Sequence, residues 1–553
     1  MTIRDKIAEL LRQAADEAQR RNLLPPLAMP EVLVERPQNP EHGDYASPLA
    51  LKLARAVRMN PLTIAEGIVS LIQVPDEIES IAVAPPGFIN FSLRSDWFRR
   101  QIDEVLSASE EYGNVDRGKD AKVQVEFVSV NPTGPLHVGH GRGAVLGSTL
   151  ANVLSAAGYR VVKEYYINDV GSQIEAFSRS LYARYQQALG IAAEVPSGGY
   201  VGEYMIDLAK EIVAAEGDRF LAKPAAEAIA ELGRMGTEKV IQSIKSDLER
   251  LGVIFDVWFS EKSLFDGEQY RKVMALLGEN AYAVGKEGVV WFASTSLGED
   301  KDNVLVRSDG SPTYFASDIA YHYNKFIERG FDEVVDIWGA DHQGHISRMK
   351  AAVGALGIDP ERLQIIISQM VTLKRGEDTI RASKRTGELT TLRQLVDEVG
   401  PDACRFFFLS RSADSQMDFD LELAKRQSAD NPVYYVQYAH ARICSILHLA
   451  QERGIDYSHG DVSLLATEPE LALIRRMLQL PEVMELVVST LEPHHLSYYA
   501  TDMATTFHNF YEKCRVVSED EALTQARLKL VKAAKIVLAK TLGLMGMSAP
   551  ERM

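Results

Sequence analysis

The chain has 553 residues, of which 46% are hydrophobic and 25% are charged. It is long enough for several domains with large cores, and its balance is that of an ordinary soluble globular protein. The formal net charge of −17 does not suit a nucleic-acid binder. Any RNA would have to be held by local basic patches against an unfavourable background.

The N-terminal segment and the cysteines indicate where in the cell the protein is expected and whether it binds zinc. Residues 1–22 have the apolar spacing of an amphipathic helix, carry several acids and lack the apolar region of a signal peptide. No apolar run is long enough to cross a bilayer, so we expect a cytoplasmic protein with no membrane partner. Cys404, Cys444 and Cys514 are far apart and never form a C-x-x-C pair. We therefore expect buried thiols and no protein-bound zinc.

The first unit, residues 1–114, is predicted to be a small α+β domain. After the first helix, the patterns predict a strand at 31–35, a helix at 46–57 and strands at 81–84 and 87–93. Alternation places Phe88 and Asn90 on one face of the last strand. An asparagine there favours an exposed face, although Phe88 fits a core position equally well. The polar stretch 113–121 is the expected linker.

The stretch Glu126 to Gly143 organises the rest of the chain. Apolar and polar residues alternate over 122–127 as in a strand, and Asn131 to Pro135 clusters turn residues. A helix at 144–157, ended by Gly158, and a strand at 161–167 follow. The sequence thus predicts a β-loop-α-β unit.

His137 and His140 lie where this loop enters the helix. A helix N-terminus offers unpaired N–H groups and a partial positive charge, which suit a phosphate group. Glycines at 139, 141 and 143 let a nucleotide approach the backbone closely. The alternative is two structural histidines in a tight turn, but the whole string after a strand favours a phosphate site.

The string His137-Val-Gly-His140 resembles the HIGH signature of class I aminoacyl-tRNA synthetases, and Asn131 to His140 is similar to its arginyl-tRNA synthetase version. The resemblance implies a Rossmann-like, doubly wound parallel-sheet catalytic domain at 115–365. The N-terminal α+β domain would then bind the tRNA elbow, with Phe88 and Asn90 among the tRNA contacts.

The middle of the chain continues the predicted sheet around a helical insertion at 178–251. Helical spacing at 203–214, 225–235 and 238–248 fits either structural filler or an RNA-contacting surface. A strand at 255–261, a hairpin pairing 289–292 with 303–307, a helix from 313, and strands at 334–337 and 365–368 follow. Gly339 to His345 comes at the carboxyl end of a strand, where open α/β sheets bind ligands.

The loop Arg381-Ala-Ser383-Lys384 resembles the KMSKS signature in degenerate form. A solvated charged loop is the alternative interpretation. We expect residues 366–420 to contain this loop and a connecting helical segment, and the chain from 401 onward to be helical. Residues 421–553 would form an all-helical anticodon-binding bundle.

The helix predicted at 433–453 carries two stripes. One is a core stripe of Val436, His440, Ile443 and Leu447; the other contains Tyr435, Tyr438 and Arg442. Two rings beside a guanidinium suit base stacking and phosphate binding, and the alternative is an amphipathic rim on a neighbouring helix. The stripe resembles the anticodon-binding helix of arginyl-tRNA synthetases, in which residues matching Tyr511 and Met553 contact the anticodon loop.

The resemblance implies that the chain activates L-arginine with ATP and transfers it to the 3′-terminal adenosine of tRNA(Arg). ATP with Mg²⁺ would be the substrate complex, and a monomer is expected. His137, His140 and Lys384 would be catalytic. The implied ATP-binding residues are Gly139, Gly339, Asp341, His342, Arg381 and Ser383. The implied arginine-binding residues are Asn131, Glu261, Tyr314, Asp318 and Gln343.

There are two alternatives to the function that the resemblance implies. Another class I synthetase or a small-molecule nucleotidyltransferase is disfavoured by the tRNA-binding tail and the pair of acids. A non-catalytic RNA-binding relative is disfavoured by the intact His137, His140 and Lys384.

Overall fold

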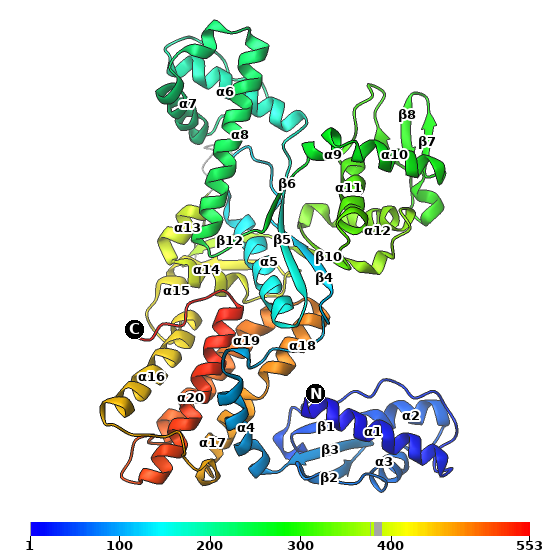
Figure 1. The fold of residues 1–553 in the computed structure, drawn as a ribbon, viewed down its shortest axis with the longest axis vertical. Coiled ribbons are helices and arrows are strands. Elements are labelled where there is room, and N and C mark those ends of the chain that lie inside the picture. Colours follow the sequence, from blue (N-terminus) through cyan, green and yellow to red (C-terminus); the bar gives the residue numbers. More distant parts are fainter. Residues whose placement is uncertain (1, 377, 381–389) are drawn as a thin grey trace.

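The structure, a computed structural model, describes residues 2–376, 378–380 and 390–553. It confirms the predicted fold class. A doubly wound parallel sheet lies in the middle of the molecule, the C-terminal helices lie below it, and the N-terminal α+β unit lies beside those helices at the lower right (Figure 1). Within the described ranges, no helix combines the length and the apolar character that a membrane crossing requires.

Five parallel strands form the central sheet in the order β11-β10-β4-β5-β6. The chain extends from β4 toward β6 on one side and returns through β10 on the other, so the direction of winding reverses between β4 and β10. Ligands bind outside the carboxyl ends of the strands at such a switch point. The strands are β4 (Lys122–Glu126), β5 (Arg160–Ile167), β6 (Val257–Ser260), β10 (Glu333–Gly339) and β11 (Leu363–Ser368).

Helices cover both faces of this sheet. Helix α5 (Val138–Ala156) lies on one face, and α11 (Tyr314–Tyr323) and α12 (Ile346–Ala355) lie on the other. Helix α5 begins at Val138, before the predicted start at residue 144. The glycines near its start are part of the helix, where they let neighbouring side chains pack closely. A Cβ on Gly147 would lie 2.2 Å from the Phe127 ring, and one on Gly141 would lie 2.7 Å from Leu392.

The N-terminal unit has a three-stranded antiparallel sheet in the order β1-β3-β2. The strand predicted at 31–35 is wrong: this segment is extended and pairs only at Glu35. The helix predicted to start at 46 starts after Pro48, because Tyr45 and Ser47 both point into the core as a strand. The elements are α1 (Ile3–Arg20), β1 (Tyr45–Ser47), α2 (Leu49–Val57), α3 (Pro61–Val69), β2 (Ile78–Ala84) and β3 (Phe88–Leu93).

Helix α4 (Ser95–Ala108) leaves this unit and packs among the C-terminal helices (Figure 1). Its Asp103 pairs with Lys529 at 2.5 Å, and Arg99 donates to the Leu465 carbonyl at 2.7 Å. The two ends of the chain are therefore tied together.

The insertion is a group of three helices at one end of the molecule (Figure 1). The two helices predicted at 225–235 and 238–248 are one helix, in which Gly236 lets Leu181 of α6 approach closely. A second excursion, after β6, contains the predicted hairpin and one further strand, β7. The elements are α6 (Ser172–Ala188), α7 (Glu203–Glu216), α8 (Ala225–Arg250), α9 (Lys262–Asp266), α10 (Gln269–Glu279), β7 (Ala283–Lys286), β8 (Val289–Phe292) and β9 (Asn303–Val306).

Residues 366–420 are not only loop and helix, and the chain after 401 is not all helical. A small sheet in the order β13-β12-β14 occupies this region. Met417 and Phe419 alternate into the core, a signal too short to stand out in the sequence. The elements are β12 (Val371–Arg375), β13 (Asp378–Ile380), α13 (Leu392–Val399), α14 (Pro401–Phe408) and β14 (Met417–Asp420).

The C-terminal part of the chain is helical as predicted, and one buried cation joins it to the catalytic sheet. Arg405 on α14 is 1% exposed and donates to the carbonyls of Met545 and Leu251 and to the Ser148 hydroxyl on α5. The helices are α15 (Leu421–Lys425), α16 (Pro432–Glu452), α17 (Glu468–Met477), α18 (Leu480–Thr490), α19 (His494–Lys513) and α20 (Glu521–Leu544).

Candidate functional site

The predicted substrate residues gather at the carboxyl edge of the central sheet. The loop after β4 contains Asn131 and leads to His137, and Glu261 follows β6 directly. A 3₁₀ turn, Ala340–His345, follows β10. All these strands are parallel, so their carboxyl ends lie at one edge, at the switch point of the sheet.

The two histidines form a stacked pair at the N-terminus of α5. Their ring centroids are 3.4 Å apart, and the backbone N–H of His137 donates to Nδ1 of His140 at 3.2 Å. Burial, with the neighbouring His137, lowers the pKa of His140 to about 3. The His140 ring is therefore neutral near pH 7. Since its Nδ1 accepts, its proton is on Nε2, which can donate to an anion.

The residues around this pair fix it in place. A Cβ on Gly139 would lie 3.1 Å from the His137 ring, so a side chain there would press on the imidazole. The backbone of His137 pairs with Thr391, and the Leu392 amide donates to the Leu136 carbonyl at 2.8 Å. The start of α13 is thus joined to the histidine loop. The predicted residues Arg381, Ser383 and Lys384 lie outside the described residues.

A buried acidic pocket lies between β5, β6 and α11. Glu261 is 2% exposed, and within the described ranges its Oε2 has no hydrogen-bond partner. The Tyr166 hydroxyl is also buried and has no partner there. Burial, together with the charges of Asp318 and Asp169, raises the pKa of the Glu261 carboxyl to about 7. Burial raises the pKa of Asp318 as well. An unpaired carboxyl beside a second acid makes a pocket that suits a cation.

The other predicted arginine-binding residues surround this pocket less closely. Tyr314, the first residue of α11, is half exposed, and its hydroxyl lies 3.7 Å from where a Cβ on Gly171 would be. The Asn131 amide donates to Gln173 at 2.6 Å. Gln343 is exposed on the 3₁₀ turn. Of the hydrogen bonds among described residues, none joins Asn131 to Gln343.

The turn after β10 carries the remaining predicted ATP-binding residues. A Cβ on Gly339 would lie 2.6 Å from the Asp341 carboxylate, which is the end of an exposed side chain that can turn away. His342 lies 3.5 Å from that carboxylate, and both side chains are exposed. The structure thus presents Asp341 and His342 at the open side of the sheet edge.

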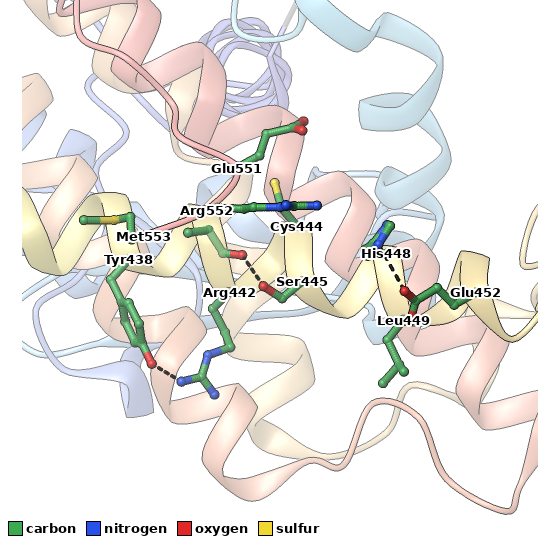
Figure 2. Close-up of a pocket in the computed structure, with 11 residues that line it drawn as sticks. Tyr438, Arg442, Cys444, Ser445, His448, Leu449, Glu452, Glu551, Arg552 and Met553 are labelled. Carbon is green, nitrogen blue, oxygen red and sulfur yellow. Dashed lines mark hydrogen bonds and ion pairs between the residues drawn. The ribbon is translucent and has the colours of Figure 1, made fainter.

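A second candidate site is a groove of about 570 Å³ between α16 and the C-terminal tail (Figure 2). Arg442 donates to the Tyr438 hydroxyl and lies over the Tyr511 ring at 4.8 Å. The tail is anchored because Nδ1 of His440 donates to the Pro550 carbonyl at 2.9 Å. Met553, 54% exposed, lines the groove beside Tyr438.

The residues of the predicted stripe on α16 therefore lie in two different environments. Tyr438 and Arg442 line the groove, whereas Tyr435 packs against the core and the His508 ring, with centroids 4.6 Å apart. The core stripe holds as predicted, with Val436 and Ile443 fully buried. Glu551 and Arg552, which sequence reasoning did not single out, also line the groove.

On the N-terminal sheet, Phe88 and Asn90 lie on the face opposite the core residues Ile89 and Phe91, which are fully buried. Phe88 is partly exposed, but Asn90 is only 8% exposed, so the exposed asparagine expected from the sequence is not found. The residues that pair with these two positions are alanines on β1 and β2: Ala46, Ala82 and Ala84. Phe88 is therefore the more accessible of the two side chains.

Sequence reasoning missed Tyr166. Alternation along β5 separates it from Tyr165, so the two rings must face opposite sides of the sheet. The pattern does not say which of the two meets the acids.

Comparisons with known proteins identify the families that the parts of the chain match. Residues 101–420 match the family described as tRNA synthetases class I (R), catalytic domain. Residues 436–553 match the DALR anticodon binding domain, and residues 2–93 match the arginyl tRNA synthetase N terminal domain. Fold and site together define a class I aminoacyl-tRNA synthetase.

Full-length relatives give the family. The arginine–tRNA ligase of Dehalococcoides mccartyi is 57% identical over 100% of this chain and 99% of its own length, and that of Carboxydothermus hydrogenoformans is 50% identical over the same shares. The fold is similar to that of Thermus thermophilus arginyl-tRNA synthetase, with a TM-score of 0.78, 23% identity and full coverage of both chains. The chain belongs to the arginyl-tRNA synthetase family and ligates arginine to tRNA with ATP.

The neutral state of His140 gives a prediction about acid stability. Its pKa is about 3 in the folded protein and ~6.5 when unfolded, so its contribution is complete above pH 6.5 and is lost as pH falls toward 3. We expect wild type to lose up to about 2 kcal/mol from this group between pH 7.5 and pH 5. The urea midpoint of His140→Asn should fall less over that range.

A matched control is His448→Asn, because His448 is exposed on α16. That variant should keep the wild-type pH dependence. If His140→Asn follows wild type down to pH 5, the ring is not held neutral in the fold.

Proposed function

We propose that Asp318 and Glu261 bind the guanidinium group of arginine. The observation that supports this most is the buried Glu261 oxygen, which has no hydrogen-bond partner among the described residues and lies beside a second acid and the likewise unpartnered Tyr166 hydroxyl. A guanidinium is always charged and has five donors in a planar fork, so it can satisfy both carboxylates and the hydroxyl at once. Its charge would also lower the raised pKa values of both acids.

The open side of the pocket suits the rest of the amino acid. We propose that the Tyr314 ring contacts the arginine side chain, and that Asn131 and Gln343 hold its backbone groups. Asn131 lies on the loop that leads to the histidines, so the carboxylate of arginine would be directed toward the ATP site. The hydrogen bond from Asn131 to Gln173 would have to be exchanged for one to arginine.

ATP would bind where α5 begins. We propose that His137 and His140 donate to the α-phosphate as the arginine carboxylate attacks it, with the neutral His140 donating through Nε2. The adenylate forms and pyrophosphate leaves. Gly139, Gly339, Asp341 and His342 would line the ATP pocket. Arg381 and Lys384, outside the described residues, would neutralise the pyrophosphate with the Mg²⁺ that accompanies ATP, and Ser383, also outside them, would contact ATP.

The second step needs no further protein nucleophile. A ribose hydroxyl at the tRNA 3′ end attacks the acyl carbonyl of arginyl-adenylate, and AMP leaves. Positioning and charge stabilisation therefore account for most of the catalysis.

We propose two surfaces for tRNA(Arg). The groove on α16 would take the anticodon loop, with Tyr438 as a stacking ring, Arg442 as a phosphate or base contact, and Tyr511 and Met553 at its edge. Tyr435 would support Tyr438 through the shared His508 ring. Phe88, which is partly exposed on the N-terminal sheet, would contact the elbow together with Asn90, which is 8% exposed on the same face.

The remaining assignments follow from this division of labour. We propose domains at 1–114, 115–365, 366–420 and 421–553, acting together in a cytoplasmic monomer, since one copy contains every proposed substrate surface. We propose no protein-bound zinc, because Cys404, Cys444 and Cys514 are buried single thiols on different elements.

Asp318→Asn tests the arginine pocket. The variant keeps the shape but removes the charge, which should cost about 3–5 kcal/mol in arginine binding. Citrulline is neutral and nearly isosteric, so it should lose far less. Inhibition of arginine activation by citrulline, measured by ATP–pyrophosphate exchange, should show a narrowed arginine-to-citrulline preference.

Asp169→Asn is the matched control for that test. Asp169 already accepts from the Ser260 hydroxyl at 2.5 Å and the Lys262 amide at 3.0 Å. It should shift the preference much less. Equal shifts in both variants would mean that general negative charge, and not pairing with Asp318, attracts arginine.

Tyr166→Phe removes a buried hydroxyl for which the described residues provide no hydrogen-bond partner. A hydrogen bond to a charged group is worth about 1.5 kcal/mol or more, so the KM for arginine should rise roughly tenfold. The KM for ATP should not change. Thermal stability without arginine should stay equal or rise, because an unsatisfied polar group is lost. An unchanged KM for arginine would remove Tyr166 from the pocket.

Tyr438→Ala and Arg442→Ala test the groove. Each lost stacking contact costs about 1–3 kcal/mol, so the KM for tRNA should rise while ATP–pyrophosphate exchange keeps its arginine and ATP dependence. Tyr498→Ala is the control, because this tyrosine is 47% exposed on α19 outside the groove. Wild-type tRNA affinity in both groove variants would assign the stripe to structure alone.

A further inference from the structure

His322 lies one helical turn after Asp318 on α11 and is 3% exposed. Its Nδ1 is 2.8 Å from the backbone carbonyl oxygen of Asp318. Its Nε2 is 3.0 Å from Oδ2 of Asp336 on β10. Both ring nitrogens therefore face oxygen atoms, one on each side of the ring.

The two contacts decide the protonation state of the ring. A carbonyl oxygen only accepts, so Nδ1 carries a hydrogen. Asp336 is fully buried, and its Oδ1 is 2.8 Å from the ammonium of Lys325. Although burial opposes it, the ammonium of Lys325 holds the pKa of Asp336 below its ordinary value. Asp336 is therefore a carboxylate, and Nε2 must also carry a hydrogen to donate to it.

We propose that His322 is an imidazolium that positions Asp318 for arginine: it clamps the turn of α11 that presents this carboxylate and keeps the carboxylate ionised in the free enzyme. His322 touches no substrate, so it is a positioning residue. The proposal rests on the proposed arginine-binding role of Asp318.

The charges around Asp318 support this assignment. Burial raises the pKa of Asp318, and the largest opposing influence is the charge of His322. The groups that face Asp318 from the elements around it are His322, Lys325, Tyr166, Glu261, His342 and Arg348. One of these, Glu261, disfavours a second negative charge in the pocket. A fixed cation behind Asp318 therefore matters most before arginine arrives.

A second cation beside His322, that of Lys325, links α11 to the loop that carries His137 and His140. Lys325, which shares Asp336 with His322, also contacts Oε2 of Glu126 at 2.6 Å. Glu126 is the last residue of β4, and the chain continues from it to the histidine pair. The contacts of His322 and Lys325 thus fix the position of α11 relative to β4, the strand that leads into the proposed phosphate-binding loop.

Two neutral variants separate charge from shape. His322→Asn keeps a donor near the Asp318 carbonyl, and His322→Gln keeps one near Asp336. Removing a nearby opposite charge raises the pKa of a carboxyl by about one unit or more. We expect the KM for arginine in both variants to rise roughly five- to tenfold at pH 6 and much less at pH 8.5. The KM for ATP should stay constant. Wild type should show a weaker rise at pH 6.

Tyr321→Phe is the matched control. This neighbour is equally buried, its hydroxyl bonds to Glu164 on β5, and phenylalanine keeps the ring that Lys325 contacts. It should lower stability without steepening the pH dependence of the KM for arginine. If Tyr321→Phe steepens it as much as His322→Gln does, the effect is structural and the proposal fails.

A second measurement needs no variant to fold well. In protein labelled with ¹⁵N-histidine, the His322 ring should have both nitrogens protonated at pH 7.5, and a singly protonated ring would overturn the proposal.

Asp318→Asn separates the arginine-binding hypothesis from the positioning hypothesis. If it leaves the KM for arginine unchanged, the arginine site itself is wrong. If it raises that KM and the His322 variants do not, only the positioning role is wrong.

Discussion

One buried ammonium, that of Lys325, holds together the two strands at the switch point. Glu126 on β4 and Asp336 on β10 are direct partners across the sheet, and like charges in such positions repel. Lys325 lies within 2.8 Å of both carboxylates and is fully buried. Removing ions from water costs several kcal/mol each, so this triad contributes less to net stability than to a unique register. Any shift of β4 against β10 would leave a buried charge unpaired.

The register of β4 against β10 determines the geometry of the site. The loop that carries His137 continues from Glu126, and the turn that carries Asp341 continues from β10, so a fixed strand pair fixes the spacing of both. A π-helical turn, Asn324–Glu328, follows α11 and places Lys325 under the sheet. The same turn brings Arg329 to Glu164 on β5. Three strands are thus tied to one end of the helix that presents the pocket acid.

The sequence was sufficient to predict the strand, loop and helix around His137 because each rests on a local pattern. It could not predict that the polar face of β4 is buried. Gln124 and Glu126 alternate with valines as solvent-facing residues would, and their partners, Tyr321 and Lys325, lie about 200 positions away. Tyr166 was missed for the same reason, since its neighbours come from other elements. The small sheet of β12 to β14 was missed because its strands are short and pair across distant segments.

The proposed pocket also gives a physical account of arginine over lysine. Both side chains are cations, so charge alone does not separate them. Glu261 and Asp318 reach the pocket from different elements, and a planar guanidinium can donate to two carboxylates and the Tyr166 hydroxyl in one plane. An ammonium is a compact point charge that would leave at least one of these buried groups without a partner, at about 1–3 kcal/mol for each unsatisfied group. The Glu261 oxygen that has no hydrogen-bond partner in the part of the chain the structure describes is therefore the atom on which this discrimination depends.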